Sequence, residues 1–228
     1  MLNLLNQILL SNNVVEQFYE EWNNNQDFRN WLNKTIPELE LCEKQQQNNP
    51  WHKYNVLGHI LHSVEAMNKQ TIGMEENERR LLAYTMLFHD IGKPEKHITR
   101  EKDGKVIDSF FEHNVASEKI ARKNLPLLNF SKKEINIIAK LVYKHDIFMF
   151  IKLNKTNNPY WKTLSKELIL EEIKDLSSVG NGQNLMRWLV MVGRADNLAQ
   201  NEKMTAESLD LLNAIDKILN TLEQNKTI

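Results

Sequence analysis

Turn-forming residues are scarce in this chain, which has seven glycines and five prolines in 228 residues. A strand-rich fold needs such residues at nearly every turn, whereas a helical fold needs them mainly at helix ends. Between them the apolar residues recur at helical spacing, and residues 81–88 are apolar on almost every side, as in a central buried helix. The sequence therefore predicts an all-α helical bundle.

The helix over residues 81–88 has signals at both ends. Three glutamates between positions 75 and 78 place negative charge before it, where the helix dipole favours such charge. Gly92 and Pro94 are predicted to end it, with the glycine as its C-terminal cap.

Other helices are indicated by similar features. Ser131 is expected to begin a helix, because Glu134 three residues later completes a capping box. Residues 96–108, which contain Asp103-Gly104, are predicted to be a polar loop or a short hairpin. Further helices are predicted over residues 56–68, 114–124, 185–200 and 208–222.

The chain length suits one large domain or two small ones. We predict that residues 1–36 are a helical lead-in packed on the main domain, and that residues 37–228 form that domain. The net charge of −1 argues against a polybasic nucleic-acid or membrane binder, although it leaves room for a local basic groove. Cys42 is the only cysteine, which excludes an internal disulfide and a thiolate zinc cluster.

Nothing in the sequence suggests a membrane protein. No apolar run approaches the roughly 20 residues that span a bilayer. The first ten residues lack a basic start and are interrupted by Asn3, Asn6 and Gln7, unlike a signal peptide. We therefore predict a cytoplasmic protein without a membrane partner.

Histidines and aspartates occur among apolar residues in the predicted helices or at their ends. Burying such a group without a partner costs several kcal/mol. A divalent cation removes this cost, because neutral imidazole and carboxylate are both metal ligands. The number of residues between one such group and the next corresponds to about one helix and its connection, so each group would come from a different helix. Helical bundles build metal sites in this way. The candidates are His59, His89, Asp90, His113, His145 and Asp196.

The order His, His-Asp, Asp on separate helices resembles the HD-domain superfamily of metal-dependent phosphohydrolases. Over about residues 36–200, the chain is further similar to the HD region of bacterial tRNA nucleotidyltransferases. The similar segments are residues 36–39, 47–59, 89–94 and 110–117, followed by Arg194-Ala195-Asp196.

The chain departs from that pattern in three respects. Asn55 stands where the family often has Asp, and Glu112 stands where it often has Gly. No Gly-rich strand-turn-strand with an Asp-x-Asp motif precedes residue 36, so the resemblance does not imply nucleotide addition. It implies only the hydrolytic activity, on an all-α HD-type bundle with a central metal site.

The resemblance also implies roles for the candidate residues. His59, His89, Asp90 and Asp196 would form a first metal site, and the alternative is a buried hydrogen-bonded network. His113 and His145 would either join Asp90 around a second ion or protonate the leaving group, so Asp90, Lys93, His113 and His145 are the candidate catalytic residues.

Basic residues near these motifs are candidates for substrate binding. Lys93 could meet a phosphate or be a solvated loop lysine. Arg194 lies about 200° around the helix from Asp196, and could reach a phosphate or pair on the surface. His52 and His62 are expected to be structural or surface histidines, and His97 to face solvent.

We therefore predict a metal-dependent phosphomonoesterase or phosphodiesterase that uses metal-activated water. Its substrate would be a nucleotide, another phosphorylated small molecule or an RNA end, and its cofactor one or two Mn, Mg, Ni, Co or Fe ions. Two alternatives remain open, a mixed-valence di-iron oxygenase with the same ligand pattern and a non-catalytic regulatory scaffold. The sequence leaves the exact substrate, native metal, oligomeric state and role of residues 1–36 undetermined.

Overall fold

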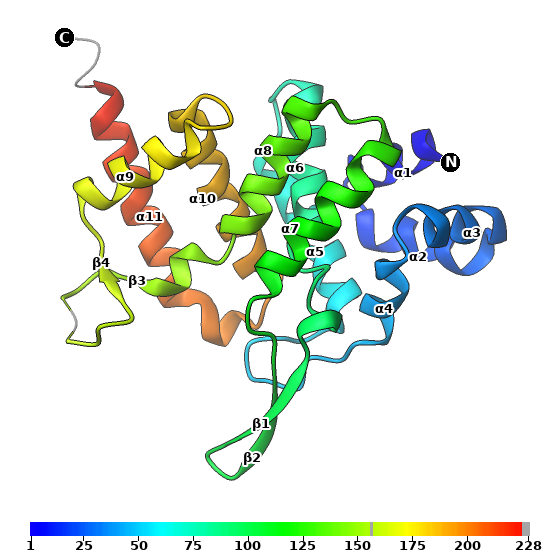
Figure 1. The fold of residues 1–228 in the computed structure, drawn as a ribbon, viewed down its shortest axis with the longest axis horizontal. Helices are drawn as coiled ribbons and strands as arrows, with labels where there is room; N and C mark the ends of the chain where they lie inside the picture. The colour runs from blue at the N-terminus through cyan, green and yellow to red at the C-terminus, as the bar shows by residue number, and fades with distance from the viewer. Residues whose placement is uncertain (156, 225–228) are drawn as a thin grey trace.

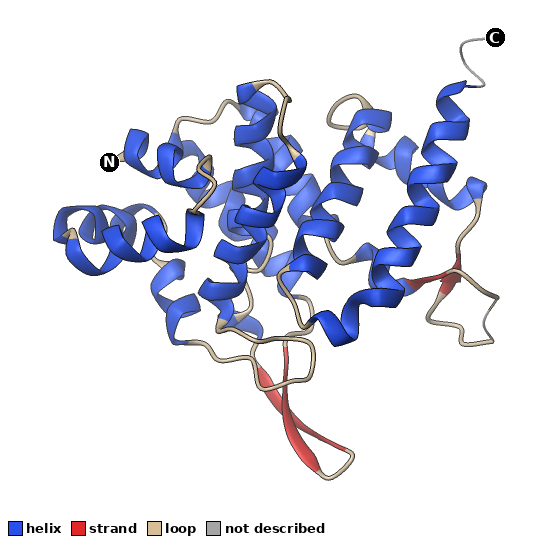
Figure 2. Ribbon diagram, turned by 180° about the vertical axis from the view of Figure 1, so that it is seen from behind, coloured by secondary structure: helices blue, strands red, loops and turns tan. Residues whose placement is uncertain are grey.

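The computed structural model describes residues 1–155 and 157–224, with only the backbone at position 102. This part of the chain is largely helical, which confirms the all-α prediction (Figures 1 and 2). The α-helices are α1 (Leu2–Leu9), α2 (Val14–Asn24), α3 (Gln26–Thr35), α4 (Glu38–Lys44), α5 (Val56–Gln70), α6 (Glu76–Phe88), α7 (His113–Asn124), α8 (Lys132–Lys144), α9 (Lys166–Leu176), α10 (Gly182–Leu198) and α11 (Glu202–Gln224). The shorter elements are the 3-10 helices η1 (Pro94–Lys96), η2 (Leu125–Leu128) and η3 (Ile147–Phe150) and the strands β1 (Ile98–Lys102), β2 (Lys105–Ser109), β3 (Ile151–Lys152) and β4 (Lys162–Thr163).

Most of the predicted helices are present, although several of their ends differ. The capping box before α8 is formed as expected, because Ser131 Oγ accepts from Glu134 N and the Glu134 carboxylate accepts from Ser131 N. Helix α11 begins six residues earlier than predicted, at Glu202, and α9 was not predicted. The predicted hairpin is also formed, with antiparallel β1 and β2.

The role predicted for Gly92 was wrong. Helix α6 already ends at Phe88, and Gly92 is not among the glycines with positive φ. The absence of a side chain serves close packing instead, because a Cβ here would lie 2.5 Å from Ser117 N and 2.6 Å from His113 O. Gly92 thus allows the segment after α6 to lie directly against the first turns of α7.

The hairpin extends away from the helices toward the bottom of Figure 1. Its turn residues Asp103 and Gly104 both have positive φ, 52° and 72°, as the tight two-residue turn of a twisted hairpin requires. The other strand pair, β3 with β4, is parallel and only two residues long. In the chain, the hairpin of β1 and β2 lies between α6 and α7.

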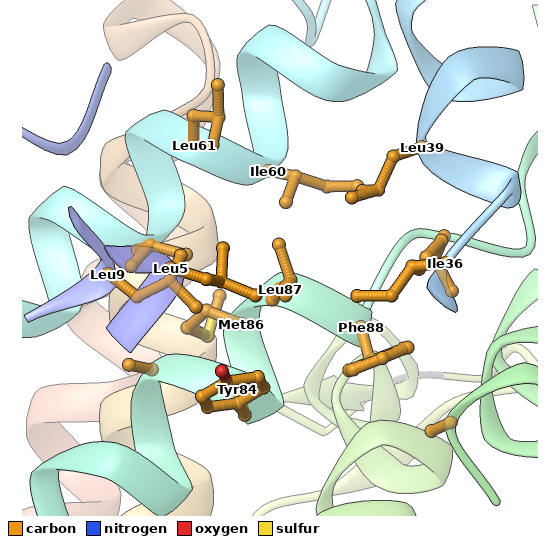
Figure 3. Close-up of a cluster of buried hydrophobic side chains, with 14 of the residues drawn as sticks. Leu5, Leu9, Ile36, Leu39, Ile60, Leu61, Tyr84, Met86, Leu87 and Phe88 are labelled. Atoms are coloured by element: carbon orange, nitrogen blue, oxygen red, sulfur yellow. The ribbon is translucent and has the colours of Figure 1, made fainter. Parts of the chain in front are cut away.

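The first helices pack directly on the central helices. Leu5 and Leu9 of α1 lie in the same buried cluster as Leu61 of α5 and Met86 of α6 (Figure 3). Ile36 and Leu39, on either side of the predicted boundary, belong to this cluster too. Residues 1–36 thus share the main core, while their separation from residues 37–228 as a distinct unit stays a prediction.

A second buried cluster joins α9, α10 and α11. Helix α10 lies between this group and the central helices, because it contacts α5, α6 and α8 as well as α9 and α11. In Figure 1 the central helices α5 to α8 are flanked by α1 to α4 on one side and α9 to α11 on the other. None of the described helices is both long and apolar enough to cross a membrane.

Candidate metal centre

The six candidate ligands come from five helices or their immediate ends. His59 lies in the first half of α5 and Asp196 near the end of α10. His89 and Asp90 directly follow α6, His113 is the first residue of α7, and His145 directly follows α8. Because these helix ends lie at the same end of the bundle, side chains that are far apart in sequence meet there.

Four of these side chains form one group that could hold a cation. Their ligand atoms, from His59, His89, Asp90 and Asp196, all lie within 4.8 Å of one another. His59 Nε2 lies 2.9 Å from Asp196 Oδ1 and 3.1 Å from Asp90 Oδ2. His89 Nε2 lies 3.3 Å from His59 Nε2. The sequence thus identified four residues that the fold brings together.

Asp90, His113 and His145 form a second such group. His113 Nε2 lies 3.0 Å and His145 Nε2 3.5 Å from Asp90 Oδ1, whereas Asp90 Oδ2 faces His59 and His89. The two oxygens of one carboxylate therefore face two different groups of donors. This is the arrangement expected of a carboxylate that bridges two ions.

Three of the histidine rings are oriented by backbone carbonyls. His89 Nδ1 donates to Met86 O at 2.7 Å, and His113 Nδ1 donates to Phe110 O at 2.8 Å. His145 Nδ1 donates to Val142 O at 2.7 Å. A neutral ring whose Nδ1 carries the proton has its lone pair on Nε2, which in each case faces the centre. This orientation is the one that suits a metal ligand, so the residues present fit a divalent cation.

The two aspartates have the charge that a cation site needs. Burial alone would raise the pKa of Asp90, but Lys93 and the surrounding histidines outweigh it and hold the pKa well below its usual value. Burial also opposes ionisation of Asp196, but the neighbouring His59, whose Nε2 lies 2.9 Å from Asp196 Oδ1, and His89 outweigh it and hold the pKa of Asp196 well below the usual value. Both side chains are therefore carboxylates at neutral pH.

Asp146 is an acidic neighbour of the site that was not predicted. Burial lowers the pKa of His145, but the charge of Asp146, together with Asp90, outweighs burial and raises it to about 9. The signal was present in the sequence, because His145-Asp146 repeats the His-Asp pair at positions 89 and 90.

Lys93 is buried beside the site and is only 5% exposed, in contrast to a solvated loop lysine. Its Nζ forms an ion pair with Asp90 Oδ2 and donates to Gln47 Oε1 at 2.8 Å. His52 Nε2 lies 3.1 Å from the same Nζ. Burial and the charge of Lys93 lower the pKa of His52 to about 2, so that His52 is neutral. The sequence reasoning missed Gln47 and assigned His52 no role in the site.

The remaining candidates contact residues outside the two groups of candidate ligands. Arg194 pairs with Asp216 at 2.7 Å and donates to Asn213, both on α11, so its proposed contact with substrate stays a prediction. His62 stacks on Tyr54 with 4.1 Å between ring centroids, as a structural histidine would. His97 is exposed, as expected, and its Nε2 lies 2.8 Å from Asp108 Oδ1.

The fold and site together define an all-α bundle with a candidate cation-binding centre where five helices meet. The family model of the HD domain matches residues 56–216, which is more than half of the chain and is the range in which all six candidate ligands lie. The chain belongs to the HD domain family, which is part of a superfamily of metal-dependent phosphohydrolases.

Proposed function

We propose that this protein is a phosphomonoesterase or phosphodiesterase that acts on a nucleotide, another phosphorylated small molecule or an RNA end. The observation that carries the proposal is the position of Asp90, whose two oxygens face separate groups of histidines. A pair of divalent ions held there would supply Lewis acidity and a nucleophilic water at neutral pH. The residues around the site supply the other requirements of the reaction.

Asp196 and His113 define the open side of the centre. Their side chains are 16% and 13% exposed, whereas those of the other four ligands are at most 2% exposed. A phosphate group would therefore approach from this side. His113 lies at this side, and His145 Nε2 lies 3.1 Å from His113 Nε2, so either could pass a proton to the leaving oxygen if they are not both occupied as ligands.

Lys93 adds a positive charge next to the Asp90 carboxylate. Hydrolysis of a phosphoester builds up negative charge on the phosphoryl oxygens, and fixed positive charge in a buried site stabilises it. The choice of nucleotides or RNA ends is supported by the similarity of residues 47–59, 89–94 and 110–117 to the HD region of tRNA nucleotidyltransferases.

A di-iron oxygenase is the second candidate, and it is favoured by the same bridging position of Asp90. Lys93 argues against it, because an ammonium group at the bridging carboxylate suits an anionic substrate. The third candidate, a non-catalytic scaffold, is disfavoured by the presence of a full set of ligands facing the centre.

The experiment is a panel of phosphomonoesters and phosphodiesters, tested with Mn²⁺, Mg²⁺, Ni²⁺ or Co²⁺. We expect turnover that is lost in Asp90→Ala and retained in Asp210→Ala, a matched change at an exposed aspartate on α11. If no ester is hydrolysed with any metal, the proposal fails. Two bound irons together with substrate-dependent O₂ consumption would establish the oxygenase instead.

A further inference from the structure

The ammonium group of Lys93 has three polar partners, one carboxylate in an ion pair and two hydrogen-bond acceptors. An ammonium carries three protons and has no lone pair, so Lys93 is the donor in both hydrogen bonds. Its partners are Asp90 Oδ2, Gln47 Oε1 and His52 Nε2. Only the first belongs to the six candidate ligands, so two other side chains help to fix where this charge lies.

Both of these side chains are themselves oriented by further contacts. His52 accepts at Nε2, so its proton is on Nδ1, which lies 2.8 Å from Asn49 Oδ1. Gln47 presents its oxygen to Lys93 because its Nε2 donates to Tyr54 O at 3.2 Å. Each acceptor is thus held in the orientation that Lys93 requires.

The segment that carries them, residues 45–55 between α4 and α5, is attached at two sides. Asn48 exchanges hydrogen bonds with Asp108 of β2, at 2.7 Å and 3.1 Å. Asn201, between α10 and α11, donates from its backbone to Trp51 O at 2.8 Å and from its side chain to Pro50 O at 2.9 Å. The segment therefore has a fixed position relative to both Lys93 and the end of α10.

We propose that Gln47 and His52 are positioning residues that hold the Lys93 ammonium at Asp90. Held in this way, the charge stays beside the carboxylate when a divalent cation approaches, which weakens cation binding but keeps a fixed positive charge for an anionic substrate. The part that concerns substrate depends on the phosphohydrolase function proposed above, whereas the part that concerns cation binding does not.

The test is a double-mutant cycle measured by Mn²⁺ titration calorimetry. Lys93→Met should tighten Mn²⁺ binding by roughly tenfold, because it removes a positive charge beside a ligand. His52→Phe and Gln47→Leu should each tighten it by a smaller factor, because the freed ammonium can move away from the cation. In the Lys93→Met background neither change should have any further effect, since residues that act through a common partner are not additive.

Three further measurements separate positioning from a merely structural role. His52→Gln, which offers an amide oxygen as acceptor, should restore binding toward the wild-type value. His62→Phe, the same change at a histidine outside the site, should leave Mn²⁺ affinity unchanged. With a hydrolysed substrate in hand, His52→Phe should lower kcat more than it changes KM.

Equal effects of His52→Phe with and without Lys93 would overturn the proposal, and so would unchanged Mn²⁺ affinity in folded His52→Phe and Gln47→Leu. The titration needs no turnover. If the proposed hydrolysis is wrong, the panel of phosphoesters will show no turnover. If the positioning role of Gln47 and His52 is wrong, the double-mutant cycle of Mn²⁺ affinity will show it.

Discussion

The Nε2 atoms of His113 and His145 lie 3.1 Å apart, and each ring donates its Nδ1 proton to a backbone carbonyl. In two neutral rings so oriented, two lone pairs would face each other in a buried site. A proton or a metal ion between them and Asp90 removes that repulsion. The pair is therefore a site that requires a positive charge.

Removing either histidine should affect one ion and spare the other. His145→Ala leaves His59, His89, Asp90 and Asp196 in place, so we expect Mn²⁺ stoichiometry to fall from two per chain to one. Metal analysis after equilibrium dialysis measures this directly. His62→Ala is the control and should still bind two ions, whereas an unchanged stoichiometry in His145→Ala would remove His145 from the ligand set.

Gly92→Ala should destabilise the protein by about 2–3 kcal/mol, because the new Cβ would overlap backbone atoms of α7 that cannot move independently. The same displacement would shift His113 and weaken the second ion site. Chemical denaturation and Mn²⁺ titration of the same variant measure the two effects. Gly180→Ala is the control, because the nearest atom to the new Cβ would be the flexible end of Leu185 at 3.1 Å. A comparable loss of stability in Gly180→Ala would contradict this explanation.

Glu112 precedes α7 with φ of 59°, in the left-handed region that favours glycine. Glu112→Gly should therefore be neutral or stabilising by up to about 1 kcal/mol, since relief of strain offsets the greater freedom of glycine in the unfolded chain. Glu112→Val should be destabilising by a similar amount. Thermal unfolding of both variants tests this, and a glycine variant less stable than the valine variant would show that no strain is stored here.

Asp108 should stabilise the hairpin base in a pH-dependent way. Burial raises its pKa, but hydrogen bonds that the carboxylate accepts from His97 Nε2 and Asn48 N outweigh burial and lower the pKa below its usual 3.8. A lowered folded-state pKa gives stability that is present above 3.8 and lost as the pH falls through the folded-state value. The difference in unfolding free energy between wild type and Asp108→Asn, about 1–3 kcal/mol at pH 6, should therefore shrink below pH 4. If the difference in unfolding free energy stays constant down to pH 3, the contacts of the ionised Asp108 carboxylate are not its cause.

The candidate metal ligands could be identified from the sequence because each is a polar group among apolar residues in a predicted helix or near its end, which is costly to bury without a partner. Glu112, the position at which the resemblance led us to expect glycine, has the left-handed backbone conformation that favours glycine. Arg194 was predicted to lie on a different helix face from Asp196, and in the structure it donates to Asn213 and Asp216 of α11.

Gln47 and His52 could not be predicted, because their role depends on how an irregular segment folds back over the end of α6. No periodicity governs such a segment, and a histidine outside a helix gives no signal of its partner. The role of Gly92 was missed for a related reason. A close approach between two segments depends on tertiary packing, whereas a glycine after a helix locally resembles a cap.

The most direct test of the account is an anomalous difference map from crystals soaked in Mn²⁺. We predict two peaks on either side of the Asp90 carboxylate, one in contact with His59, His89 and Asp196 and the other with His113 and His145. A map without a peak among His59, His89, Asp90 and Asp196, from crystals soaked at saturating Mn²⁺, would contradict the central claim that these side chains bind a metal ion.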